Sequence, residues 1–408
     1  MPGTAVHSRH WRRAVVMLFA VAAGTNVPTP LLLVYRDRLH LSPSTLTALF
    51  GFYAAGLVPS LLVSGPLSDR LGRRRVVLPP VALSAVASLL FIVAAHSIVL
   101  LFVARFLQGL VSGAVFSVGT AWIGELSAGD GAGARRAAAA QSGGFALGPL
   151  VSGLLGQYAP LPTTLPYLLH VVLVGVGLLA ARGLPETVPL GPEHRQQQAR
   201  GPVLRRQDRW FFLTLVAPVA VCVYAFPSVL ISALPALVAL PRGQGVVLTG
   251  VLAGLTLGAS TVAAQQQRRL GTRAPVVGAL SGAAGYAVAL VAARTGQVAL
   301  LVPGGLLLGA GGGLMLASGL GFVARLAQPD RRGALTGIFY SSAYVGFAAP
   351  LATATLARHG GAELPLALLA GLALLLAVRV TVSRPPAPSP GQQEGAAPLP
   401  GPPLPDRD

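Results

Sequence analysis

The sequence predicts an all-α polytopic membrane protein in which twelve transmembrane helices form two pseudo-symmetric six-helix bundles. Three observations carry this prediction: the composition, the number of long apolar runs and an internal repeat. The chain has 408 residues, of which 53% are hydrophobic and only 10% are charged. A soluble domain has about 25% charged residues, so this chain has too few to cover a water-facing surface. A soluble enzyme or binding module is therefore strongly disfavoured.

The basic charge does not point to nucleic acid. All 30 basic residues are arginines, against 12 acidic residues, which gives a formal net charge of +18. A nucleic-acid-binding protein gathers such charge on one soluble face, whereas these arginines stand in short groups between apolar runs. We therefore expect no nucleic-acid partner. The absence of lysine in a chain rich in Ala, Gly, Pro and Arg favours a GC-rich bacterial genome.

The apolar runs give the helices in order. A spanning helix needs about 20 mostly apolar residues, and the chain meets this requirement at 13–35, 44–66, 76–96, 98–121, 137–158, 163–182, 210–233, 245–265, 274–294, 297–323, 334–356 and 364–382. The first run follows a group of arginines, as a secretory signal does. It continues past Pro28 and Pro30 without a clear cleavage site, which indicates an uncleaved first helix. Cys222, the only cysteine, lies inside a run and has no partner for an internal disulfide.

Arginine placement predicts the orientation in the membrane. Cytoplasmic segments next to spans carry an excess of Arg and Lys. With the N-terminus inside, 24 arginines flank the cytoplasmic ends, five flank the outer ends, and Arg105 lies within a span. We therefore expect a multi-pass protein of the bacterial plasma (inner) membrane with both termini in the cytoplasm. Trp11, Trp122 and Trp210 then all fall at the inner interface, where amphipathic rings anchor helix ends.

The chain repeats itself. Seven residue pairs are 199 positions apart: Trp11 with Trp210, Pro28 with Pro227, Gly51 with Gly250, Arg70 with Arg269, Leu71 with Leu270, Gly72 with Gly271, and Arg74 with Arg273. Gly109 and Gly309 follow at 200. So many matches in equivalent spans predict two six-helix halves, an architecture of transporters whose substrate site lies between the halves.

The repeat also gives the domain organisation. We predict an N-terminal bundle at 1–182, a cytoplasmic central loop at 183–209, a C-terminal bundle at 210–383 and a tail at 384–408. Nine of the 25 tail residues are proline, and almost none is large and apolar, so we expect the tail to be disordered and extended.

The loop after the second run carries the strongest motif, Gly65-Pro-Leu-Ser-Asp69-Arg70-Leu-Gly72-Arg73-Arg74-Arg75. It resembles the loop signature of the major facilitator superfamily, and together with the twelve spans and the repeat the resemblance covers essentially the whole chain. In that family the loop is thought to latch one face of the transporter shut. The resemblance therefore implies a conformational latch formed by Gly65, Asp69, Arg70, Gly72, Arg73, Arg74 and Glu125.

Physical chemistry supports this interpretation of the loop. Glycine allows a tight turn, and a carboxylate such as Asp69 is stabilised at a helix N-terminus. We expect Arg70 and Arg73 to pair with Glu125 at the cytoplasmic end of the fourth span. The alternative is that the arginines only set topology, but Asp69 is needless for that. In the second copy Arg268 stands where the first has Asp69, so only the N-terminal half keeps the full latch.

In the fourth span, Arg105, Gln108 and Gly109 resemble a second motif of the superfamily, whose arginine has been linked to proton coupling. An arginine inside a span costs roughly 3 kcal/mol or more, so we expect it to face the bundle interior or a wet cavity. The alternative is a structural arginine bonded to carbonyls of neighbouring helices. His170 is a second candidate proton site, with a reference pKa of about 6.5; a packed, hydrogen-bonded neutral histidine is its alternative.

In the fifth span, the sequence around Gly144, Gly148, Pro149 and Gly153 resembles the signature of the family's antiporters. Ser152 stands where that signature usually has glycine, and Arg135 replaces an upstream glycine of its longer form. The same residues belong to a ladder of small side chains at four-residue spacing, which lets two helices approach closely. Ordinary packing of small residues is therefore the alternative interpretation.

No Asp or Glu lies deep in any predicted span, which counts against a purely cationic substrate. Candidates for the substrate cavity are polar or aromatic residues within spans, namely Asn26, Tyr53, Tyr224, Tyr340 and Tyr344. Each is alternatively a polar group that packs between helices. No pattern typical of a metal site, a nucleophile or a carboxylate pair is present, so we expect no enzyme, no metal and no cofactor.

The resemblance implies a secondary active transporter that works by alternating access. The antiporter-like fifth span favours proton-coupled efflux of a small apolar or weakly charged compound, drug-like or a metabolite, by a protein that we expect to be a monomer in the lipid bilayer. An uptake permease for a nutrient or metabolite is the alternative, because the loop and the repeat are common to both directions. A non-transporting polytopic receptor or a lipid enzyme is a remote alternative.

Overall fold

The protein is helical at all twelve positions that the sequence predicts. The computed structural model describes residues 4–127, 132–188, 204, 206–238, 240–326 and 332–383, and this part of the chain contains helices and turns but no β-strand. The predicted disordered tail at 384–408, and most of the predicted central loop, lie outside the described residues. The all-α fold class is confirmed.

Within each half, the helices follow one another with short connections. The first half contains α1 (Thr4–Asn26), α2 (Pro28–Leu39), α3 (Pro43–Leu71), α4 (Arg73–Val93), α5 (Ile98–Glu125), α6 (Ala132–Tyr158) and α7 (Leu165–Ala181). The second half contains α8 (Arg209–Phe211), α9 (Ala217–Ser228), α10 (Leu234–Leu237), α11 (Gly245–Leu270), α12 (Ala274–Thr295), α13 (Leu301–Leu326), α14 (Arg332–Val345), α15 (Ala349–Gly360) and α16 (Glu363–Val382).

Most of these helices can cross a membrane by length and composition. Within the described residues, nine helical segments are long and apolar enough to span one, and the segment Gly245–Thr295 contains both α11 and α12. The two remaining predicted spans are α6 and the 17-residue α7. Large apolar side chains are exposed on the outer helices, including Leu372, Leu375 and Val378 on α16. A lipid environment would cover such a surface.

Three predicted spans are interrupted. The first breaks at Val27, between α1 and α2, because Pro28 and Pro30 have no N–H to continue the helix. The seventh span contains two π-helical segments, Phe212–Val216 and Val229–Ala233. The eleventh tightens into a 3₁₀ turn at Gly346–Ala348. The sequence predicts one continuous helix at each of these three positions, so the breaks are corrections to that prediction.

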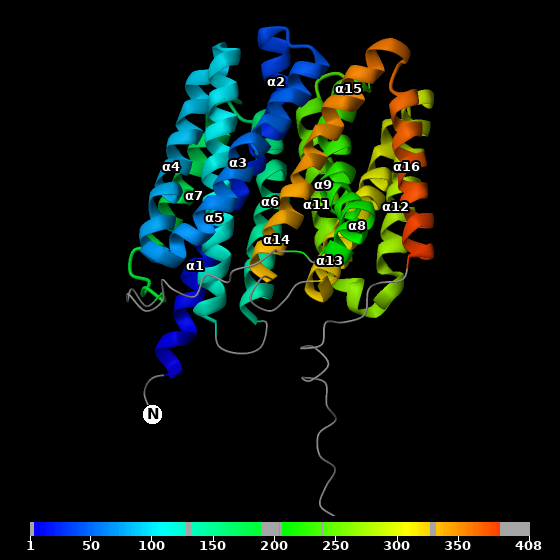
Figure 1. The fold of residues 1–408 in the computed structure, drawn as a ribbon. Coiled ribbons are helices and arrows are strands. Elements are labelled where there is room, and N and C mark those ends of the chain that lie inside the picture. The colour runs from blue at the N-terminus through cyan, green and yellow to red at the C-terminus, as the bar shows by residue number, and fades with distance from the viewer. Residues whose placement is uncertain are drawn as a thin grey trace, which may run out of the picture.

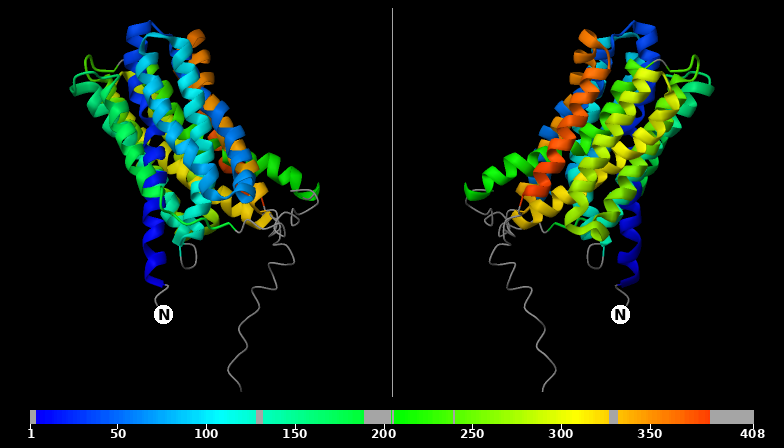
Figure 2. Two further views of the ribbon diagram at one scale, coloured as in Figure 1. Left: turned by 90° about the vertical axis from the view of Figure 1, so that its left-hand side faces the viewer. Right: turned by 90° about the vertical axis from the view of Figure 1, so that its right-hand side faces the viewer.

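The helices form two bundles that lie side by side (Figure 1). In the first, α3 packs on α5, α1 on α6 and α7, and α4 on α5 and α7. In the second, α13 packs on α9, α11 and α12, and α12 packs on α16. The bundles meet where α6 and α2 contact α11, and where α3 contacts α14 and α15. Figure 2 shows the N-terminal end of α1 extending past the other helices.

The repeat in the sequence corresponds to equivalent contacts in space. A Cβ atom added to Gly109 would lie 2.0 Å from the carbonyl oxygen of Tyr53, and one added to Gly309 would lie 2.0 Å from that of Thr256. Both glycines therefore let a helix backbone touch its neighbour, α5 on α3 in one half and α13 on α11 in the other. The two halves are built on the same close helix pair.

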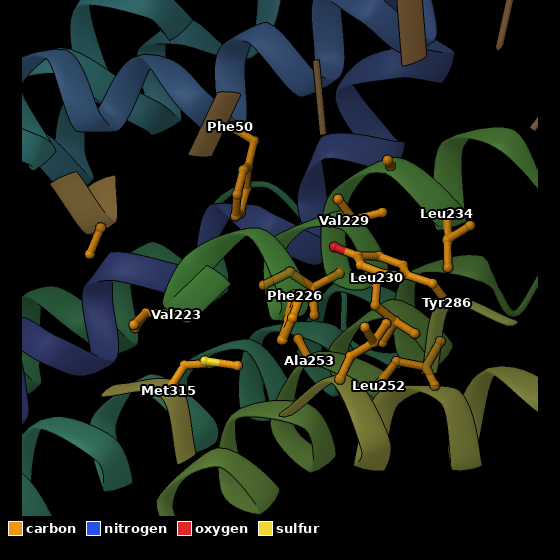
Figure 3. Packing of buried hydrophobic residues seen from close by; sticks show 14 of the residues in the cluster. Phe50, Val223, Phe226, Val229, Leu230, Leu234, Leu252, Ala253, Tyr286 and Met315 are labelled. Atoms are coloured by element: carbon orange, nitrogen blue, oxygen red, sulfur yellow. The ribbon is translucent and has the colours of Figure 1, made fainter. Parts of the chain in front are cut away.

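The apolar core of the second half is continuous with the interface between the bundles. Figure 3 shows Phe226, Leu230, Leu252 and Tyr286 packed together, with Phe50 of the first half in the same cluster. The rings of Phe226 and Tyr286 meet edge to face at 5.7 Å. Such close packing fixes the position of α9, which carries part of the cavity described below.

Candidate functional site

The predicted latch centres on Arg73. Its guanidinium is buried and donates through Nη2 to Glu125 Oε1 at 2.7 Å and through Nη1 to Ser68 Oγ at 2.5 Å. The same Nη1 lies 2.6 Å from Asp69 Oδ1. One arginine thus ties the end of α3 and the start of α4 to the end of α5.

The latch in the structure differs from the predicted one in two details. Asp69 lies in the last turn of α3 rather than at the N-terminus of α4, because the chain turns only at Gly72 (φ +94°). Among the described residues, Arg73 alone forms an ion pair with Glu125. Arg70 and Arg74 are exposed, whereas Arg73 is buried against Glu125.

Glu186 occupies the helix N-terminus that we had expected for Asp69. Its carboxylate accepts the backbone N–H groups of Arg73 at 2.8 Å and of Arg74 at 3.0 Å. Burial alone would raise the pKa of Glu186, but these and two further backbone N–H donors outweigh burial and lower the pKa below its usual value. A Cβ on Gly72 would lie 2.5 Å from Glu186 Oε2, so the glycine leaves room for this carboxylate.

The segment that carries Glu186 is fixed on both sides. Trp122 on α5 donates through Nε1 to the Pro185 carbonyl at 3.1 Å, and the Thr187 hydroxyl donates to Glu125. The chain after α7 is therefore part of the latch, which the sequence analysis missed. The available signal was an acidic residue directly after the sixth apolar run, in Pro185-Glu186-Thr187.

The break in the first span explains the position of Gln108 and Arg105. Pro28 cannot donate to the carbonyl of Gly24, four residues earlier. That carbonyl instead accepts Gln108 Nε2 at 2.6 Å and the Val27 N–H at 3.3 Å, and the next carbonyl, on Thr25, accepts Arg105 Nη1 at 3.3 Å. The fourth span thus donates to backbone carbonyls beside the break.

Arg105 also holds the second span. It donates through Nε to the Leu49 carbonyl at 3.1 Å, through Nη2 to the Phe50 carbonyl at 3.0 Å, and through Nη1 to Gln108 at 2.8 Å. These contacts are those expected of a structural arginine bonded to neighbouring helices. The guanidinium also lies 5.5 Å from the ring centres of Phe50 and Tyr53, both of which line a cavity.

This cavity lies between the two bundles and contains about 480 Å³ of space not filled by atoms, part of it open to solvent. Both halves contribute to its wall. The lining residues are Thr25, Asn26, Phe50, Tyr53, Arg105, Phe145, Tyr224, Pro227, Ser228, Ile231, Leu257, Tyr344 and Phe347. Four of the five predicted cavity residues are among them, together with Arg105.

Aromatic rings form the largest part of the wall. The rings of Tyr224 and Tyr344 stack at 4.7 Å with an angle of 21°, and Tyr344 and Phe347 stack at 5.8 Å with an angle of 15°. The Tyr224 hydroxyl donates to that of Tyr344 at 3.3 Å. Tyr340 is not in the wall and packs edge to face on Phe339 at 5.7 Å. Phe50 and Phe347 were missed because a phenylalanine in an apolar run carries no sign of its direction.

His170 lies apart from the cavity wall. It is buried between α1 and α4, where its ring nitrogens lie 2.6 Å from Ser88 Oγ and 3.1 Å from the Ala20 carbonyl oxygen. A Cβ on Gly24 would lie 2.1 Å from His170 Nε2. This environment is that of the packed, hydrogen-bonded histidine, and a role in proton coupling stays a prediction.

The small residues of α6 make two different contacts. Gly144 and Gly148 face α1, where a Cβ on Gly148 would lie 2.1 Å from the Ala23 carbonyl oxygen. Gly153 faces α11, where a Cβ added to it would lie 2.8 Å from Gly250 Cα. A Cβ on Gly250 would in turn lie 2.6 Å from the Pro149 carbonyl oxygen. The antiporter-like segment therefore forms part of the interface between the bundles.

Hydrogen bonds join the two bundles at the end away from the N-terminus. Gln157 Nε2 donates to the Gly243 carbonyl at 2.6 Å, and Gln157 Oε1 accepts the Val247 N–H at 3.4 Å. Arg358 Nη2 donates to Ser42 Oγ at 3.4 Å. The latch, by contrast, lies at the end that carries the N-terminus (Figure 1), and its two ion pairs, from Arg73 to Asp69 and to Glu125, join helices of the first bundle.

Comparison with known proteins gives a consistent result. A sequence model described as Major Facilitator Superfamily matches residues 14–297. An 80-residue stretch is 38% identical to multidrug resistance protein MdtL of Escherichia coli O139:H28 strain E24377A, and the same holds for MdtL of Shigella boydii serotype 18. The chain matches only 20% of the length of these relatives, and 20% of this chain is covered.

Solved structures resemble the whole fold. A POT family transporter in complex with a thioalcohol conjugated peptide has a TM-score of 0.73 at 13% identity, covering 92% of this chain and 96% of that one. The nucleoside transporter NupG has a TM-score of 0.70 at 13% identity, covering 91% of this chain and 99% of that one. At such low identity the likeness concerns the fold.

Proposed function

The chain belongs to the Major Facilitator Superfamily, and we propose that within this family of membrane transporters it is a proton-coupled exporter. It is a multi-pass membrane protein and not an enzyme. In this proposal it works by alternating access on a small apolar or weakly charged compound, either drug-like or a metabolite. Protons are the coupling ion, and the working unit is a monomer in a bacterial plasma membrane with cytoplasmic termini.

The cavity is the observation that carries the proposal. It lies between the bundles, takes wall residues from both, and is lined mainly by aromatic and aliphatic side chains. A site between two halves can face either side of a membrane when the halves rock against each other. Concave, mostly apolar sites with a few polar groups are typical of small-molecule binding.

Export is favoured over uptake by two further observations. The stretch similar to MdtL, a protein named for multidrug resistance, is the first. The second is the antiporter-like α6, whose Gly153 and Pro149 contact Gly250 across the interface between the bundles. A helix that touches both bundles at glycines can change its contact when they move.

We assign Arg105 and Gln108 a positioning role in coupling. Their side chains connect the break in the first span to the second span and to the cavity. A change in the charge around Arg105 would therefore alter backbone contacts in both helices. In this proposal the latch consists of Asp69, Arg73 and Glu125. Glu186 adds to it by accepting the backbone N–H of Arg73.

Accumulation in cells tests the direction of transport. An efflux-deficient bacterial host would express the wild type, Tyr344→Ala or an empty vector, at matched membrane levels, with and without a protonophore. We expect the wild type to lower the accumulation of some fluorescent compounds or antibiotics, and both the protonophore and Tyr344→Ala to abolish the difference. Higher accumulation with the wild type would instead establish uptake, and equal accumulation across the panel would contradict export.

A further inference from the structure

We propose that the cavity binds planar aromatic compounds that carry one negative charge, such as aromatic carboxylates, in preference to their neutral and cationic analogues. This inference rests on the proposed function, since it names the substrate class of the same cavity. It is carried by three features of the wall: a stacked aromatic surface, an arginine without a carboxylate partner, and polar side chains without protein hydrogen bonds.

The stacked rings favour a planar ligand. Tyr224, Tyr344 and Phe347 lie with their planes inclined by 15° to 35° and their centres 4.7 to 5.8 Å apart. Phe50 extends the group, with its ring 5.3 Å from that of Phe347. Aromatic rings stack on one another in this range of distances. A flat ring can therefore extend the stack, whereas a bulky aliphatic compound of the same volume cannot.

The charge of the wall favours an anion. Arg105 is the charged residue of the lining, and no Asp or Glu belongs to the lining residues. Its side chain is 2% exposed, and a buried charge is costly unless it is paired. A ligand carboxylate would supply the missing counter-charge.

Arg105 has a donor left for this purpose. Its bonds to Leu49, Phe50, Thr25 and Gln108 use four N–H groups, and a guanidinium has five. Among the hydrogen bonds of the described residues, the remaining Nη2 hydrogen has no acceptor. A hydrogen bond from arginine to a carboxylate is about twice as strong as one between neutral groups.

Two polar side chains extend the site. Asn26 lines the cavity beside the break in the first span, and its amide group makes no hydrogen bond within the described part of the chain. The Tyr53 hydroxyl lies near Thr25 and Ser112 but makes no hydrogen bond of normal geometry there. The Asn26 amide can donate to a carboxylate in the cavity, whereas the fully buried Tyr53 hydroxyl can do so only after a small shift of its ring.

The same wall disfavours a cation. Aromatic faces do attract cations, but the Arg105 guanidinium already lies 5.5 Å from the ring centres of Phe50 and Tyr53. A second positive charge in the cavity would meet this one in a medium of low polarity, where repulsion is strong. An ammonium ligand would find no carboxylate in the wall to offset it.

Binding of three matched compounds tests the inference. Naphthoate, naphthamide and naphthylmethylammonium share one fluorescent ring system and differ in charge. Equilibrium dialysis would measure their affinity for the purified full-length protein in detergent. We expect naphthoate to bind about tenfold more tightly than naphthamide, as one charge-assisted hydrogen bond would give, and the ammonium compound to bind most weakly.

Variants locate the binding in the cavity. Phe347→Ala should weaken all three compounds by a similar factor, whereas Arg105→Gln should remove the difference between naphthoate and naphthamide. Phe52→Ala is the matched control, because Phe52 is on the same helix as Phe50 but is 40% exposed on the outer surface. If Arg105→Gln does not fold, the comparison of the three compounds on the wild type still decides the question.

The outcomes separate this inference from the proposed function. Equal or tighter binding of naphthamide, tightest binding of the ammonium compound, or no binding of any of the three would overturn the preference for anions. Export would stand in each case if the cell assay shows it for other compounds. Tight binding of naphthoate without any proton-driven export would support the preference for anions and contradict the proposed function.

Discussion

At the scale of single residues, neighbouring arginines of one loop have different tasks. Arg73 is 9% exposed and bonds to Glu125, Ser68 and Asp69. Arg70 is exposed at the end of α3. The sequence identified the loop and the acid Glu125, but it gave both arginines the same partner. The direction in which a side chain points near a turn at positive φ depends on the neighbouring helices. No local sequence pattern records that direction.

This difference gives a first prediction. Arg73→Gln should lower stability by about 1–3 kcal/mol, because it leaves Glu125 without its charged partner, and it should strongly reduce transport. Arg70→Gln, the matched control, should change stability by less than about 0.5 kcal/mol. Thermal unfolding in detergent and transport assays on both variants check this. Equal effects of the two substitutions would refute the assignment.

Glu186 gives a prediction about pH. Its pKa is lowered in the folded protein because backbone N–H donors stabilise the carboxylate more than burial destabilises it. The stabilisation is therefore present above the usual value of 4.5 and is lost as pH falls below it. We expect the wild-type Tm to fall more steeply than that of Glu186→Gln in this acidic range. Parallel curves would show that Glu186 does not hold the latch.

At the scale of helices, the positions of the spans followed from the sequence and their breaks did not. The twelve predicted runs of about 20 apolar residues are all helical in the structure. The π-helical segment Phe212–Val216 and the 3₁₀ turn at Gly346–Ala348 were not predicted, because their residues are as apolar as those around them. In these two segments the packing of neighbouring helices decides which carbonyl each backbone N–H bonds to, and therefore which type of helix forms. In the first span the prolines were visible, but the bond from Gln108 to the Gly24 carbonyl beside the break was not.

Close helix packing gives a third prediction. Gly109→Ala should destabilise the protein by about 1–3 kcal/mol and reduce transport, because its methyl group would collide with the Tyr53 carbonyl and push α5 from α3. Gly258→Ala on α11 is the matched control, since a Cβ there meets no atom within 4 Å. Its stability should be unchanged or slightly higher. Thermal unfolding and transport assays on both variants check this, and a Gly109→Ala variant as stable and as active as the control would contradict the close contact.

The cavity shows what sequence could and could not supply about the site. Asn26, Tyr53, Tyr224 and Tyr344 were predicted because polar groups inside apolar runs need a reason to be there. Phe50 and Phe347 were not, since nothing in the sequence distinguishes a phenylalanine facing a cavity from one facing lipid. Tyr340, one helical turn before Tyr344 on α14, is not among the wall residues and packs on Phe339 instead, which the shared spacing of the two tyrosines did not reveal.

At the scale of the whole molecule, the bundles are joined by hydrogen bonds at the end away from the N-terminus. Gln157 contributes two of these bonds, to Gly243 and Val247. Alternating access requires that this closure open in another state. The repeat predicted two equivalent bundles, and the structure has them. It could not predict which end is closed, because Gln157 bonds to backbone groups of the other bundle, and no sequence pattern records such a partner.

The closure gives a fourth prediction. In a Cys222→Ser background with Ile231→Cys in the cavity wall, Gln157→Ala should increase the labelling rate by an impermeant thiol reagent added from the side of the closure. The reason is that fewer hydrogen bonds then hold that side shut. Arg294→Ala is the control, because its ion pair with Glu363 lies within one bundle. An unchanged rate with Gln157→Ala, or an equal increase with Arg294→Ala, would contradict the role of Gln157.

The central claim is that transport through the cavity is coupled to protons, and proton movement in everted membrane vesicles tests it most directly. Vesicles with an acidic interior and a pH-sensitive fluorescent dye would receive a compound that the wild type exports from cells. We expect the compound to dissipate the proton gradient with the wild type, and to do so much less with Tyr344→Ala at the same membrane level. An undisturbed gradient, with a compound that is demonstrably exported, would contradict proton coupling.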